Sequence, residues 1–137
     1  MPPPITLNLI STLRLVPLIL LISFPINSNS QILNWAFNAG GSGRDEATFM
    51  HVDNEGNVLV TGLFSGTADF DNSASVYNLT SAGSEDIFVA KYTSAGQFIW
   101  AFRVGGADRD HGLGITCDAN NNVIITGFSG SCFPLTR

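Results

Sequence analysis

The chain has 137 residues, including 14 glycines, and is 45% hydrophobic but only 12% charged. This composition is typical of a folded, turn-rich β protein and excludes a disordered segment or a coiled coil. The formal net charge is −5. The chain therefore lacks the basic surface with which a nucleic-acid-binding protein neutralises phosphates, and we expect no nucleic acid among its partners.

Residues 1–30 are expected to be a signal peptide. They carry one basic residue, Arg14, no acidic residue, and an apolar stretch over residues 15–24. The small residues Ser28 and Ser30 fit a signal-peptidase site, which predicts a mature chain that begins at Gln31 and is secreted, periplasmic or on the cell surface. The alternative is a retained membrane anchor, because residues 5–24 are long enough to span a bilayer. Arg14 in the middle of that segment argues against an anchor, so we expect no membrane span after cleavage.

Short apolar runs rich in Val, Ile, Phe and Tyr alternate with segments rich in Gly, Asn, Asp and Ser, which predicts strands joined by tight turns. In chain order, strands are expected at residues 32–37, 47–52, 57–64, 87–92, 98–102, 113–117 and 122–128. The turns at 53–57, 94–97 and 118–122 contain Gly or Asn, which tolerate positive φ. Residues 65–86 are expected to form a long connection.

The sequence repeats itself with an offset of 65 residues. Aligning Trp35 with Trp100 gives 12 identities in 28 columns without a gap, as far as Gly62 over Gly127. A unit that recurs at this length buries its faces by stacking on its neighbours. Runs 58–60 and 87–90 are apolar without alternation, so both of their faces should be covered.

These features predict an all-β fold, namely a partial β-propeller of stacked four-stranded antiparallel blades. We expect it to occupy residues 31–137, with repeat units that start near residues 35 and 100 and with about one complete blade and two partial ones. Gly62 and Gly127 are expected where a neighbouring blade approaches closely.

A family resemblance is carried by six short segments: Trp35-Ala36, Gly40-Gly41, residues 53–57, 58–62 and 86–92, and Gly96 to Trp100. Together they resemble the bacterial seven-bladed β-propeller repeat family of the SBBP type, over residues 35–130. The resemblance implies an exported bacterial repeat protein of unassigned function. Seven blades of this length would need about 455 residues. We therefore expect either a fragment of a longer protein or a chain that assembles with further blades or with copies of itself.

The connections after the second and fourth strands of a blade lie on one side of it, which groups residues 40–46, 65–86 and 105–111. They carry six candidates for a ligand-binding rim: Arg44, Asp45, Asp69, Asp71, Arg109 and Asp110. Loops on a rigid scaffold often bind ligands, and the expected ligand is an unknown protein or glycan. The alternative is that the repeated Arg-Asp pair makes structural hydrogen bonds in turns and between blades, which its presence in both units favours.

Two turns present side-chain oxygens at alternate positions, as a calcium loop does. They consist of Asp53, Glu55 and Asn57 in the first unit and of Asp118, Asn120 and Asn122 in the second. The glycine at the sixth position and the terminal glutamate of an EF-hand are missing. A hairpin turn explains both segments more simply, so we expect no cofactor, with calcium as the alternative. Asp69 and Asp71 are a similarly weak metal candidate.

Two cysteines and two histidines are candidates for chemistry. Export would allow Cys117 and Cys132 to pair, but Cys117 occupies the repeat position of Val52, which favours a small buried hydrophobe. His51 and His111 stand in different columns of the repeat, and no nucleophile elbow, phosphate loop or paired-carboxylate motif accompanies them. We expect His51 at a strand edge and His111 in a solvated loop.

We expect no catalytic residue, and we assign Trp35 and Trp100 to blade packing rather than to a sugar-binding platform. The favoured function is an exported binding or surface-structural module that is not an enzyme. One alternative is part of a propeller-fold hydrolase or lyase whose catalytic residues lie in missing blades. Another is a frame-shifted reading frame without a function of its own.

Overall fold

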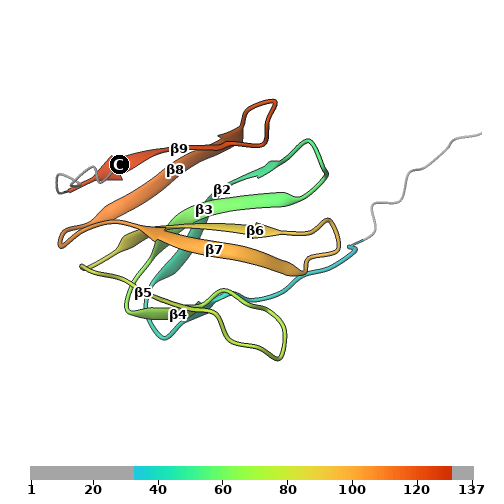
Figure 1. The fold of residues 1–137 in the computed structure, drawn as a ribbon. Helices are drawn as coiled ribbons and strands as arrows, with labels where there is room; N and C mark the ends of the chain where they lie inside the picture. The colour runs from blue at the N-terminus through green and yellow to red at the C-terminus, as the bar shows by residue number, and fades with distance from the viewer. Residues whose placement is uncertain (1–32, 131–137) are drawn as a thin grey trace, which may run out of the picture. The chain divides into compact units, whose positions relative to one another are not determined.

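The computed structural model describes residues 33–130, and all regular secondary structure in that range is β (Figure 1). The strands are β1 (Gly40–Gly41), β2 (Asp45–Val52), β3 (Val58–Phe64), β4 (Thr67–Asp69), β5 (Asn78–Thr80), β6 (Asp86–Tyr92), β7 (Phe98–Val104), β8 (Asp110–Cys117) and β9 (Val123–Ser129). The expected signal peptide and Cys132 lie outside the described residues. Within residues 33–130 no helix is long and apolar enough to cross a bilayer.

The centre of the fold is an antiparallel four-stranded sheet in the order β2-β3-β6-β7. Strands β3 and β6 pair without a register shift from Val58 opposite Tyr92 to Phe64 opposite Asp86. Both are buried along almost their whole length, as their non-alternating apolar sequences predict. This sheet is the complete blade expected from the sequence, and the fold is an all-β partial propeller.

Tight turns join neighbouring strands as predicted. Between β2 and β3, Asp53 N–H donates to Asn57 O at 2.9 Å and Gly56 has φ +83°. Between β8 and β9, Asn121 takes the place of Gly56 in the repeat and also has a positive φ, of +62°. The left-handed conformation is therefore kept in both units, by a glycine in one and by an asparagine in the other.

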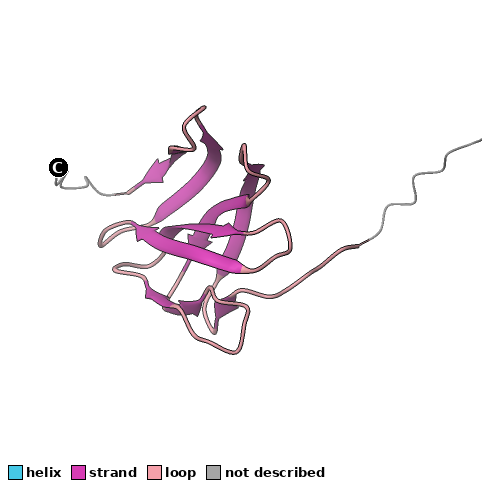
Figure 2. Cartoon of the chain, turned by 45° about the vertical axis from the view of Figure 1, so that its right-hand side comes forward, coloured by secondary structure: helices cyan, strands magenta, loops and turns pink. Residues whose placement is uncertain are grey.

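An apolar cluster lies on each face of the four-stranded sheet, and Figure 2 shows the strands and loops that surround this sheet. On one face, the hairpin of β8 and β9 packs Ile115 against Leu59, Ile87 and Val89. On the other face, Phe88, Ala90 and Tyr92 pack with residues from the region of β4 and from the N-terminal segment, namely Ala68, Phe70, Phe37 and Ala39. Over β3 and β6 both faces are covered, by different kinds of element, whereas β2 remains largely exposed.

The hairpin of β8 and β9 repeats that of β2 and β3 in detail. Both β2 and β8 carry a bulge at the same repeat position, between Ala47 and Phe49 and between Gly112 and Gly114. Gly62 in β3 pairs with β2 at the first of these bulges, and Gly127 in β9 pairs with β8 at the second. A Cβ at residue 62 would lie 1.9 Å from Glu46 O, and one at residue 127 would lie 2.2 Å from His111 O. The close approach predicted at these glycines is confirmed, but it comes from the neighbouring strand of the same hairpin and not from another blade.

Two further expectations about the strands were wrong. Residues 33–39 form no strand, although in the repeat they correspond to the whole of β7. The expected connection over residues 65–86 contains β4 and β5, which form a three-stranded sheet with β1. Strands of two or three residues are too short to show a periodic pattern, and the pairing of Gly40 with Asp69 joins distant parts of the sequence.

Candidate functional site: the charged rim between the repeat units

The rim forms where the segment before β6 meets the starts of β2 and β8. Arg44 directly precedes β2, and Arg109 directly precedes β8. Glu85, the residue before β6, forms a parallel bridge with Arg109, and its carbonyl accepts a hydrogen bond from Asp110 N–H at 2.7 Å. The structure therefore brings the two repeated arginines to one place.

A single carboxylate joins the two arginines. Arg44 Nη1 lies 3.0 Å from Glu85 Oε1, while Arg109 Nε and His111 Nε2 both contact Glu85 Oε2, the latter at 2.7 Å. Arg44 also contacts Glu46 through Nη2 at 2.7 Å. The Glu85 side chain is 12% exposed, whereas those of the two arginines are about half exposed. Glu85 thus connects the start of one unit to the start of the next. We call the cluster of Glu85 with Arg44, Arg109 and His111 the clasp.

The clasp keeps Glu85 ionised. The hydrogen bond from Arg109 lowers the pKa of Glu85 most, burial opposes it, and the hydrogen bonds from His111 and Arg44 lower it further, to about 2. The same contacts, first with Glu85 and then with Glu46, raise the pKa of Arg44. His111 is therefore not in a solvated loop as expected: it is a part-buried residue of β8 that contacts Glu85.

Asp45 and Asp110 act on the backbone beside the clasp. Gly41 N–H donates to Asp45 Oδ2 at 2.7 Å, and Gly106 N–H donates to Asp110 Oδ2 at 2.8 Å, in the same place of each unit. The Oδ1 atoms of both aspartates are buried and have no hydrogen-bond partner among residues 33–130. The repeated Arg-Asp pair thus makes structural bonds within a turn and between units.

Asp69 and Asp71 are not part of the clasp. Asp69 Oδ1 accepts hydrogen bonds from the N–H groups of Asp71 and Tyr77, at 3.0 and 2.8 Å. The next residue, Asn72, donates from its side chain to Gly96 O in the turn between β6 and β7. That turn is at the opposite end of β6 from Glu85, so these two aspartates organise the loop between β4 and β5.

The two candidate calcium turns are closed by their own hydrogen bonds. Asp53 Oδ1 accepts from the N–H groups of Glu55 and Asn57, and Lys91 Nζ lies 2.7 Å from Asp53 Oδ2. Burial opposes ionisation of Asp53, but the bonds from Lys91 and Asn57 outweigh it and lower the pKa well below the ordinary value. In the second turn, hydrogen bonds from Asn122 lower the pKa of Asp118. A calcium ion would have to compete with these donors.

The remaining candidates lie in packing positions. Trp35 Nε1 donates to Ser94 O at 2.9 Å, and its ring stacks on Phe37 with 5.5 Å between centroids. Trp100 stacks on Phe102 and packs against the cluster beneath β8 and β9. Cys117 packs against the same cluster. No group of three or more His, Cys, Asp or Glu residues that could hold a metal occurs in the described part of the chain.

Sequence reasoning missed Glu85 and two other charged residues, Lys91 and Arg103. Arg103 Nη1 lies 2.5 Å from Oδ2 of the fully buried Asp86. Glu85 has no counterpart within the 28 repeat columns, so the repeat could not reveal it. The available signal was an acidic residue directly before a buried strand, in a connection expected on the same side as two repeated arginines.

No family profile matches the sequence, and no solved structure matches it. The sequence is similar to an uncharacterised WD repeat-containing protein of Acanthamoeba polyphaga mimivirus, with 28% identity over 116 residues. The alignment covers 74% of this chain and 8% of that protein. WD repeats form propeller blades. The four-stranded sheet, the internal repeat and this relative together identify a β-propeller-like repeat module. The relative is viral, so the resemblance to the bacterial SBBP family is not confirmed by it.

Proposed function

We propose that the chain is an exported, non-catalytic β-propeller-type module of the SBBP kind that binds a protein or glycan through Arg44 and Arg109. The observation that supports this most is the clasp, in which one carboxylate holds arginines of two successive units while half of each arginine side chain stays exposed. Side chains that are held in place before binding lose less conformational entropy when a ligand arrives. The rim is therefore a preorganised polar contact surface.

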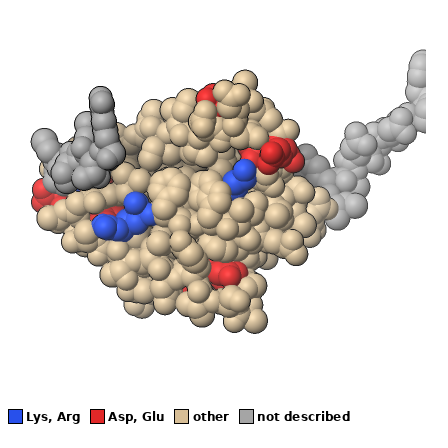
Figure 3. Space-filling view, in the orientation of Figure 1, with Lys and Arg blue, Asp and Glu red and all other residues tan. Residues whose placement is uncertain are grey.

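The chemistry of the rim favours isolated carboxylates as ligand groups. Arg109 contacts Glu85 through Nε and not through its two terminal nitrogens, and half of its side chain is exposed. Those nitrogens can bind a carboxylate with two parallel hydrogen bonds. The charges of the two arginines are balanced by Glu46 and Glu85. Figure 3 shows basic and acidic groups scattered over a largely uncharged face. Such a surface suits single acidic groups and not a polyanion.

An array experiment tests this proposal. The full chain is applied to oligosaccharides that contain uronic acids and to their neutral counterparts, and to peptides that contain Glu or, as matched controls, Gln. Binding to one acidic set should weaken at least tenfold, about 1.4 kcal/mol, in the Arg109→Ala variant. Gln97→Ser, an exposed change in the turn between β6 and β7, should leave binding unchanged. Equal binding of acidic and neutral probes would overturn the proposal.

Export has its own test. Intact mass spectrometry of secreted material should show a chain that begins at Gln31. Material that still contains residues 15–24 would contradict the proposed signal cleavage.

A further inference from the structure

The chain contains one complete interface between repeat units. Four residues of the hairpin of β8 and β9 face the central sheet, where Leu59, Ile87 and Val89 receive them. These four residues are Ile115, Cys117, Val123 and Ile125. The offset of 65 assigns a counterpart in the first unit to each of them. The internal interface therefore shows which kind of surface these counterparts can pack against.

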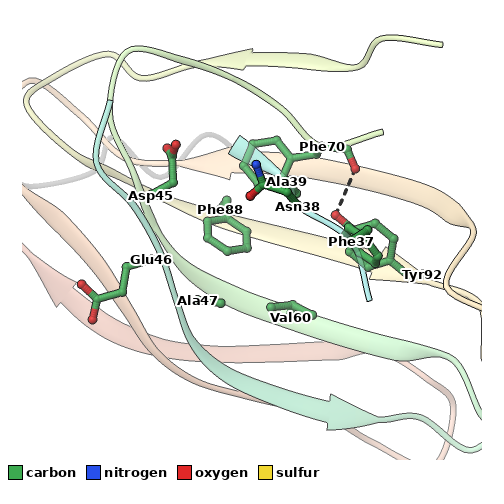
Figure 4. Close-up of a pocket in the computed structure, with 10 residues that line it drawn as sticks. All are labelled: Phe37, Asn38, Ala39, Asp45, Glu46, Ala47, Val60, Phe70, Phe88 and Tyr92. Atoms are coloured by element: carbon green, nitrogen blue, oxygen red, sulfur yellow. Dashed lines mark hydrogen bonds between the residues drawn. The ribbon is translucent and has the colours of Figure 1, made fainter. Parts of the chain in front are cut away.

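The counterparts form what we call the front strip: Met50, Val52, Val58 and Val60. Met50 and Val52 are 57% and 53% exposed, whereas Ile115, the counterpart of Met50, is 4% exposed. A groove of about 330 Å³ runs along the strip and is lined on its other side by Trp35 and Phe37. An adjoining pocket of about 260 Å³ continues it (Figure 4), with Val60 on one side and aromatic rings, including those of Phe37 and Tyr92, on the other.

The outer side of the hairpin of β8 and β9 carries a second apolar surface, which we call the back strip: Leu113, Ile124 and Phe128. These residues are 57%, 51% and 55% exposed. Ile124 and Phe128 correspond in the repeat to Leu59 and Leu63, which are each 1% exposed. Leu113 corresponds to Thr48, whose hydroxyl donates to Gly112 O of the next unit at 2.5 Å. The back strip therefore repeats the surface that receives a neighbouring unit within the chain.

We propose that the front strip of one copy docks on the back strip of a second copy, head to tail. The two strips are the two halves of an interface that the chain already forms once between its own units. Met50 in the front strip and Ile124 and Phe128 in the back strip are more than half exposed, whereas their repeat counterparts Ile115, Leu59 and Leu63 are buried. A unit of a repeat protein is stabilised by covering such faces. Because the contact joins two different surfaces, it continues from copy to copy, into a closed ring or an open filament.

Sedimentation velocity of the full chain over a range of concentrations tests the contact. The wild type should associate with increasing concentration. Met50→Glu and Ile124→Glu each place a charge in one strip, at a position that is more than half exposed in a single copy, and each should weaken association at least tenfold, about 1.4 kcal/mol. Val76→Glu, which changes a 66% exposed residue outside both strips, should associate like the wild type.

Mixing the two variants decides the geometry. The Met50→Glu chain keeps its back strip and the Ile124→Glu chain keeps its front strip, so an equimolar mixture should form a one-to-one dimer that grows no further. Circular dichroism checks that each variant is folded. A monomeric wild type would overturn the proposal, because the strips would then be left for another partner. A mixture that stays monomeric, or association that only Met50→Glu abolishes, would also overturn it, the latter by indicating contact between two front strips.

Discussion

Replacing Gly62 by alanine tests how closely β2 and β3 approach at the bulge. The new Cβ would lie 1.9 Å from Glu46 O and 2.9 Å from the ring of Phe88, and real Cβ atoms essentially never come within 3.0 Å of such neighbours. Glu46 O belongs to the backbone of a paired strand, so it cannot rotate away as a side chain would. Added atoms in a well-packed site cost about 1–3 kcal/mol. The overlap with backbone places Gly62→Ala at the upper end, at about 3 kcal/mol.

Thermal unfolding followed by circular dichroism measures this cost. In a domain of about 100 residues, 1 kcal/mol shifts the Tm by about 4–8 °C. The variant should therefore melt about 12–24 °C below the wild type. Urea titration should give the same loss in the free energy of unfolding.

Gly114→Ala is the matched control. Its Cβ would meet only Thr126 Oγ1 within 4 Å, at 2.8 Å, and a threonine side chain can turn aside. Alanine also restricts the unfolded chain, so this variant should lie within about 1 kcal/mol of the wild type. Wild-type melting of Gly62→Ala, or an equal loss in both variants, would refute the steric argument.

Three further predictions concern the core and the ion pairs. Leu59→Ala should lower the free energy of unfolding by about 2–5 kcal/mol, because Leu59 is 1% exposed. Ile124→Ala changes the same repeat position, but Ile124 is 51% exposed, so this variant should lose under about 1 kcal/mol. Equal losses in chemical denaturation would contradict the internal interface. Glu85 has a pKa lowered to about 2 in the folded state, so its contribution to stability is complete above its ordinary pKa and is lost as the pH falls through about 2. The Tm of Glu85→Gln should therefore fall less steeply with acid than that of the wild type, and parallel curves would exclude a role of the clasp in stability. Asp53→Asn leaves the 14% exposed Lys91 without its ion pair and should lower the free energy of unfolding by about 3 kcal/mol. Adding Lys91→Met should recover part of that loss, and a further loss would show that the broken ion pair is not its cause.

The sequence by itself determined the turns of the repeat and its strands from β2 onward, but not the absence of a strand over residues 33–39. These features depend on neighbouring residues: the apolar runs that became β3 and β6, and the turn positions Gly56 and Asn121, which both have positive φ. The repeat also predicted that a propeller-type unit recurs. The same logic located the close approach at Gly62, because glycine in both units indicates a space that no side chain can occupy.

Only the tertiary structure decided what meets these elements. Glu85 joins Arg44 and Arg109 across separations of 41 and 24 residues, and no periodic pattern encodes a contact of that kind. The cover of the sheet by Phe37 and Phe70 likewise depends on segments without a long strand. Local backbone conformation is determined by adjacent residues. The partner of a charged or apolar side chain depends instead on which distant segments the folded chain places beside it.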